Sequence, residues 1–100
     1  MSEARAKTAE EVRHEFIDLI RAYSKYWSEL SNKTPQERCD GLAFSILNIF
    51  DGTTWLPAMN IHLSPHPDDA DYCKEIKESW YEPDMVINDC MLHELWKDSK

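Results

Sequence analysis

The chain has 100 residues, of which 42% are hydrophobic and 11% aromatic, a composition that excludes a disordered chain and predicts one folded domain over residues 1–100. The formal net charge is −8. Residues 1–33 carry six acidic and six basic side chains, so residues 34–100, with thirteen acidic and five basic, account for all of it. A surface this acidic repels nucleic acid and acidic membrane surfaces and attracts a basic protein surface.

The N-terminus and the cysteines together predict a cytoplasmic protein. Residues 1–12 are polar and lack the apolar core of a signal peptide, and no apolar run approaches the roughly 18 residues of a membrane span. The three cysteines, Cys39, Cys73 and Cys90, are an odd number, which favours reduced and mostly buried thiols. We expect residues 1–7 to be a flexible N-terminus.

The first predicted element is a helix of about 22 residues that ends near residues 31–33. Thr8 and Glu11 have the spacing of a capping box, in which each side chain accepts from the backbone N–H of the other. Apolar residues then recur every three or four positions and form one stripe: Val12, Phe16, Leu19, Ile20, Tyr23, Trp27 and Leu30. The stripe is expected to pack in the fold, or alternatively to be the seam of a helical homo-oligomer or adaptor.

A second helix is predicted from Thr34 to Asp51. Thr34, Pro35 and Glu37 supply three independent signals of a helix start, and Asp51 followed by Gly52 supplies the stop. Gly41 costs about 1 kcal/mol in a helix interior, so we expect it to permit close approach to the first helix. A three-residue link makes the two helices an antiparallel hairpin.

The period of the pattern changes after residue 53. Apolar and polar residues alternate over 59–63, as in a half-buried strand, and the flanking prolines make it short. Residues 85–87 are the other β-like run, and pairing the two gives a small two-stranded β element.

Two shorter helices complete the prediction. The third covers residues 67–79, with His66 as its N-cap, Pro67 in its first turn, and Tyr72 and Ile76 at its buried edge. The fourth is capped by Asn88 or Asp89 and carries Met91, Leu92, Leu95 and Trp96 on one side. The expected fold class is therefore mainly α, with an antiparallel helical hairpin, two shorter helices and a minor two-stranded β element.

The run His-Pro-Asp-Asp at 66–69 resembles the motif of zinc-dependent N-acetylglucosaminyl deacetylases. That resemblance implies His66 and Asp69 as zinc ligands, Asp68 as the base, and His93 as the remaining ligand. In the family the motif follows the first strand of a large doubly wound sheet, which 100 residues of this pattern cannot build. A helix start explains the same residues, because carboxylates in a first turn meet the positive end of the helix dipole. We interpret the run as a helix start and the resemblance as coincidental.

A second metal hypothesis uses His and Cys residues at ligand-like spacing. Imidazole and thiolate groups at such spacings can make a tetrahedral zinc site. The candidate ligands are His62, His66, Cys90 and His93. Satisfied or solvent-facing histidines are the commoner outcome, so a small zinc-binding protein, structural or weakly catalytic, is the alternative to a protein without metal.

Nothing in the sequence argues positively for catalysis. Gly41 and Gly52 are the two glycines of the chain, so no glycine-rich phosphate loop exists. The serines and cysteines have no recognisable catalytic partner. We predict a non-enzymatic protein without a cofactor.

The strongest functional signal is an acidic segment with an aromatic pair, Trp80-Tyr81. Aromatic side chains among carboxylates have the composition of a contact site for a basic partner. The alternative is that Trp80 folds back into a small core. The predicted contact residues are Asp68, Asp69, Asp71, Glu75, Glu78, Trp80, Tyr81, Glu82 and Asp84.

The combination GLAFSIL, FDG, PHPDD and LHELW, in that order over residues 37–97, resembles a family of small acidic proteins from bacterial genomes and their phages. No activity is assigned to that family, so the resemblance implies no catalytic residues. It does imply a genomic setting in which small acidic proteins neutralise toxins or defence enzymes. The resulting hypothesis is an inhibitor or immunity-type protein whose acidic C-terminal half docks on a basic effector such as a nuclease or toxin.

Overall fold

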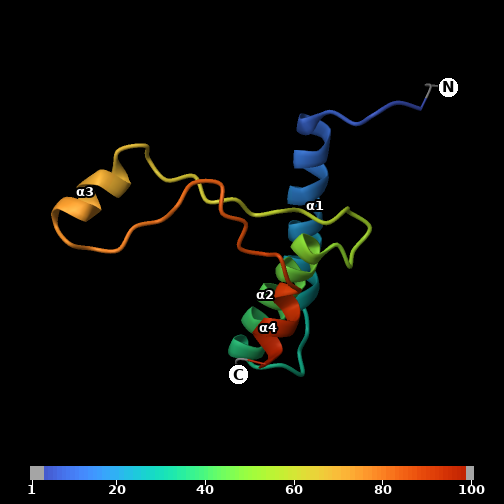
Figure 1. Ribbon diagram of the computed structural model, residues 1–100. Helices are drawn as coiled ribbons and strands as arrows, with labels where there is room; N and C mark the ends of the chain where they lie inside the picture. The colour runs from blue at the N-terminus through green and yellow to red at the C-terminus, as the bar shows by residue number, and fades with distance from the viewer. Residues whose placement is uncertain (1–3, 99–100) are drawn as a thin grey trace. The chain divides into compact units, whose positions relative to one another are not determined.

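The computed structural model describes residues 4–98 and is mainly helical, as predicted (Figure 1). Contacts group the chain into two compact units, a first unit Met1–Leu47 and a second unit Asn48–Lys100. Residues 1–3 of the N-terminal segment predicted to be flexible lie outside the described residues. No described helix has the length and apolar character needed to cross a membrane. The helices are α1 (Ala9–Ser28), α2 (Pro35–Asp51), α3 (Asp69–Glu75) and α4 (Leu92–Asp98).

The predicted capping box at the start of α1 is confirmed. The Thr8 hydroxyl accepts from the Glu11 N–H at 3.1 Å, and the Glu11 carboxylate accepts from the Thr8 N–H at 2.9 Å. Hydrogen bonds from Arg5 and from Thr8 lower the pKa of Glu11 to about 2. The helix ends at Ser28, earlier than predicted, and the Leu30 carbonyl beyond this end accepts from Arg38 Nε at 2.9 Å.

α1 and the first turns of α2 form the predicted antiparallel hairpin around Trp27. The Thr34–Glu37 capping box starts α2 as expected, and the helix then runs back along α1. The Trp27 indole N–H donates to the Ser45 hydroxyl at 2.9 Å. The ring fills the space a side chain at Gly41 would need, since an added Cβ would lie 2.5 Å from ring carbon Cε3. Gly41 thus permits the close approach that the sequence predicts.

In the second unit, the end of α2 has the hydrogen bonds of a Schellman motif. The Thr53 N–H donates to the Asn48 carbonyl and the Gly52 N–H to the Ile49 carbonyl, both at 3.2 Å. This motif requires a left-handed residue after the helix, and Gly52 has φ +79°. The predicted stop at Asp51 is therefore confirmed.

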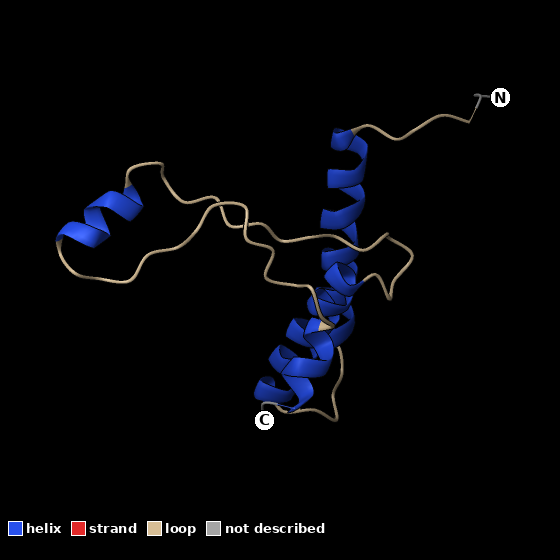
Figure 2. Ribbon diagram, viewed as in Figure 1, coloured by secondary structure: helices blue, strands red, loops and turns tan. Residues whose placement is uncertain are grey.

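The predicted two-stranded β element is wrong, because no strand forms in the described residues (Figure 2). The two segments meet in one isolated antiparallel bridge, His62 with Val86, flanked by hydrogen bonds from Ile87 N–H to the Ile61 carbonyl and from Leu63 N–H to the Met85 carbonyl. The backbone pairing does not continue on either side of this bridge. The Ile61 N–H donates to the Asn88 side chain, and the Leu63 carbonyl accepts from Asp84, a residue with φ +62°.

The third helix is shorter than predicted. It begins at Asp69 rather than Pro67, because Pro67 and Asp68 form a turn in which the His66 ring Nδ1 accepts from the Asp68 N–H at 3.2 Å. It ends at Glu75 rather than Ser79 because Lys77 adopts φ +59°. The Glu78 N–H then donates to the Cys73 carbonyl at 2.8 Å and closes the helix.

Burial is sparse in the described residues. Ile49 and Leu56, both in the second unit, are the buried apolar residues there. Tyr72 and Ile76 were predicted at a buried edge but are 62% and 49% exposed, so no other described element covers that edge of α3. The expectation of mostly buried thiols is also wrong, since Cys39 and Cys90 are exposed.

Candidate functional site

α4 is capped by a carboxylate that is distant in the sequence. Asp51, the last residue of α2, accepts hydrogen bonds from the Leu92 N–H at 2.8 Å, the His93 N–H at 2.8 Å and the His93 ring Nδ1 at 2.6 Å. The predicted cap at Asn88 or Asp89 is therefore wrong. A buried carboxylate supplies what those residues were expected to supply, and it also fixes the ring of His93.

The environment of Asp51 favours its charged form. Burial alone would raise the pKa of the Asp51 carboxyl, but the His93 and Leu92 N–H groups, together with the His93 ring, outweigh burial and lower the pKa below its ordinary value of 3.8. Because the Asp51 carboxylate accepts three hydrogen bonds from α4, it stabilises the start of that helix. It has the character of a cap rather than of a catalytic base.

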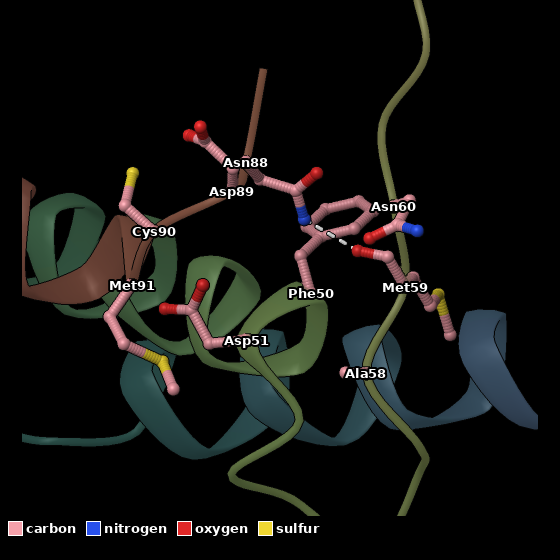
Figure 3. Close-up of a pocket in the computed structure, with 9 residues that line it drawn as sticks. All are labelled: Phe50, Asp51, Ala58, Met59, Asn60, Asn88, Asp89, Cys90 and Met91. Atoms are coloured by element: carbon pink, nitrogen blue, oxygen red, sulfur yellow. Dashed lines mark hydrogen bonds between the residues drawn. The ribbon is translucent and has the colours of Figure 1, made fainter. Parts of the chain in front are cut away.

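Asn88 clamps the segment that follows α2. Its side-chain Nδ2 donates to the Met59 carbonyl at 2.5 Å, the bond drawn in Figure 3, and its Oδ1 accepts from the Ile61 N–H at 2.7 Å. Asn88 is buried, so both bonds matter to stability. The residue predicted to cap a helix instead joins two loop segments.

These two residues border the pocket of Figure 3, a cavity of about 380 Å³ within the second unit. Phe50, Met59 and Met91 give it apolar walls, while Asn60 and Asp89 bring polar groups to its surroundings. The buried polar groups at its border already have hydrogen-bond partners within the chain. The pocket therefore offers shape and apolar surface, and its buried polar groups are engaged in holding the fold.

The four residues of the zinc hypothesis lie in separate surroundings. His93 contacts Asp51, His62 lies in the bridge with Val86, the His66 ring accepts from Asp68, and Cys90 is exposed. In residues 4–98 no group of three or more His, Cys, Asp or Glu side chains is placed to hold a metal ion. The hypothetical ligand set is therefore not brought together in the described residues.

The deacetylase-like residues form a turn before α3. Besides the backbone contact, His66 Nδ1 lies 3.9 Å from a carboxylate oxygen of Asp68, and both side chains are largely exposed. Asp69 is the first residue of α3. The interpretation of this run as a helix start is confirmed, with the start moved to Asp69.

All nine predicted contact residues are exposed. We call the exposed side chains of residues 68–84, in the second unit, the acidic–aromatic surface. Tyr81 is 73% exposed and Trp80 40% exposed, so Trp80 does not fold back into a core. Tyr72 and Ile76, which were predicted at a buried edge, add exposed apolar area to this surface.

Trp80 is held on this surface by two polar contacts. Its indole N–H donates to the Glu82 carboxylate at 2.9 Å. Lys74 Nζ lies 4.7 Å from the centroid of the Trp80 ring, within the range of a cation–π contact. These contacts restrict the ring before any partner arrives, and restriction of this kind lowers the entropy cost of binding.

A second cavity, of about 320 Å³, opens on the same surface. Leu63, Ser64, Pro65, Asp69 and Tyr81 line it.

Comparisons of the chain with family models, curated proteins and solved structures each found no match. The exposed aromatics and carboxylates of the acidic–aromatic surface are the chemistry that a binding partner would meet.

Proposed function

We propose that this chain is a non-enzymatic inhibitor of the immunity or anti-defence type, which binds a basic effector protein such as a nuclease or toxin through the acidic–aromatic surface. The observation that carries the proposal is the exposure of Tyr72, Ile76, Trp80 and Tyr81 among carboxylates in one short stretch of chain. Large apolar side chains exposed together mark interaction sites, and the surrounding charge selects the sign of the partner.

The distribution of charge between the two units supports a basic partner. Residues 48–100 contain eleven acidic and four basic side chains, a net −7, whereas residues 1–47 contain eight and seven, a net −1. The unit that exposes Trp80 and Tyr81 is thus the one that carries the charge. Opposite charge on the partner would steer the encounter and raise the association rate.

The proposal is tested by affinity capture from the source cell with matched variants. Glu75→Lys with Glu78→Lys reverses two exposed carboxylates on the acidic–aromatic surface, and Asp18→Lys with Glu29→Lys makes the same charge change on α1 and its C-cap. We expect the wild-type chain and the α1 variant to capture the same basic protein, identified by mass spectrometry. The surface variant should lose it.

Two results would count against the proposal. One is capture of a protein that is retained equally by both variants. The other is a captured protein with an acidic surface, to which this charge distribution would be repulsive.

A further inference from the structure

The cavity beside α3 is built from parts held in place by the backbone. Leu63 is fixed from both sides, because its N–H donates to the Met85 carbonyl and its carbonyl accepts from the Asp84 N–H, each at 2.9 Å. Pro65 has a restricted φ, and the Asp69 N–H donates to the His66 carbonyl at 3.0 Å. Three of the five lining residues are therefore positioned before any ligand binds.

The walls differ in chemistry in a way that suits one type of side chain. Leu63 and Pro65 offer apolar surface, Tyr81 offers an exposed aromatic ring, and Asp69 offers an exposed carboxylate. An apolar stem would lie against Leu63 and Pro65. A flat cation would stack on the Tyr81 ring, and paired N–H donors would bind the Asp69 carboxylate. Arginine combines all three properties, since its guanidinium is planar, stacks on aromatic rings and binds carboxylates in a fork.

We propose that this pocket binds the side chain of an arginine presented by the basic partner, an inference that rests on the proposed function. The net −7 of residues 48–100 favours a cationic occupant. Tyr81 is a better platform than Trp80, because Lys74 already lies over the Trp80 ring. Lysine fits less well, because its ammonium is a compact, strongly hydrated point charge that cannot stack.

The test uses a short peptide as the probe, titrated into the isotopically labelled full-length chain and followed by NMR. The probe is acetyl-Gly-Arg-Gly-amide, and its matched controls replace arginine by lysine or by citrulline, the neutral isostere. We expect saturable shifts of the Leu63, Ser64, Asp69 and Tyr81 amides with the arginine peptide. The lysine peptide should bind several-fold more weakly, and citrulline should leave these amides unmoved.

Variants locate the effect. Tyr81→Leu and Asp69→Asn should each weaken binding of the arginine peptide about five-fold or more. Asp71→Asn removes the same charge from the first turn of α3 without touching the pocket lining, and should change binding less than about two-fold. Equal effects of Asp69→Asn and Asp71→Asn would overturn the pocket, as would equal shifts with citrulline.

The failure of this inference is distinguishable from failure of the proposed function. If the peptide does not bind at the pocket while Glu75→Lys with Glu78→Lys still abolishes capture of the partner, only the arginine pocket is wrong. If the peptide does not bind and the Glu75→Lys with Glu78→Lys variant still captures the partner, both the arginine pocket and the proposed function are wrong.

Discussion

Asp51 links two distant points of the chain. It is the last residue of α2, and its buried carboxylate accepts the first N–H groups of α4, 41 and 42 residues later. Hydrogen bonds to a charged acceptor contribute more than neutral ones, and a helix of seven residues is marginal on its own. α4 therefore depends on one side chain outside itself.

Asp51→Asn should lower the free energy of unfolding by about 1–3 kcal/mol, because the amide keeps one acceptor oxygen and turns its NH₂ donors toward N–H groups. The pH dependence follows from the lowered pKa of Asp51. The stability from this carboxylate is fully present above its unfolded pKa near 3.8 and is lost as the pH falls through the lower folded pKa. Denaturant titrations from pH 3 to pH 7 should thus show a smaller loss in acid for Asp51→Asn than for the wild type. Equal losses would remove Asp51 from this role.

Gly41 is the second position where one atom decides the packing. An added Cβ would lie 2.5 Å from Cε3 of Trp27, a ring already fixed by its bond to Ser45. Alanine gains about 1 kcal/mol of helix propensity, but overpacking costs about 1–3 kcal/mol, so Gly41→Ala should destabilise by up to about 2 kcal/mol.

The matched control for Gly41→Ala removes the ring. In a Trp27→Leu background, the same Gly41→Ala change should be neutral or stabilising in thermal unfolding. A loss of the same size in both backgrounds would mean that the clash with Trp27 is not the cause.

The paired segments of the second unit show how a ladder is stopped. A two-stranded pair without further strands is marginal, and this one is interrupted on one side by the Asn88 side chain and on the other by the left-handed Asp84. The Asn88 side chain thus bonds the Ile61 N–H and the Met59 carbonyl, and the Ile61 N–H is not available for backbone pairing.

Asn88→Ala should therefore loosen the pairing, at a cost of about 1–3 kcal/mol for the buried groups left without partners. Hydrogen exchange should speed up at the Ile61, Leu63 and Ile87 amides. Asn60→Ala, at an exposed neighbouring position, is the control and should leave these amides protected. Unchanged exchange in Asn88→Ala would show that the pairing does not need the clamp.

The elements that the sequence predicts well are those with local signals. Both capping boxes and the Asp51–Gly52 stop involve residues within a few positions of one another, and all three are confirmed. The cap of α4 could not be predicted, because Asp51 lies about 40 residues away in the sequence. The early end of α3 depends on Lys77 at φ +59°, a conformation that favours glycine and that a lysine does not announce.

The same division holds for the candidate site. Composition predicts an exposed, acidic set of contact residues, because carboxylates are costly to bury, and all nine are exposed. Spacing alone suggested a zinc site that the fold does not assemble, because convergence of distant histidines depends on tertiary structure. The exposed Tyr72 and Ile76 were missed because periodicity implies a buried face only when another element covers it.

Trp80 and the carboxylates are expected to act on different steps of binding. Trp80→Ala removes an apolar anchor and should speed dissociation from the captured partner about 10–30-fold, with little change in association rate. Trp55→Ala is the matched control, since Trp55 is 63% exposed in the same unit but lies outside the acidic–aromatic surface. Comparable effects of the two substitutions in surface plasmon resonance would show that Trp80 has no special role.

In the proposed function, charge on the acidic–aromatic surface guides the chain to a basic partner. The most direct test is the association rate with the purified captured partner, measured over a range of ionic strengths. Glu75→Lys with Glu78→Lys should slow association about ten-fold or more at low salt, and the deficit should shrink as salt is raised. Asp18→Lys with Glu29→Lys, which changes the net charge equally, should associate within about two-fold of the wild type. An association rate of the surface variant equal to that of the wild type at low salt would contradict this role of the surface charge, as would slowing of both variants by the same factor.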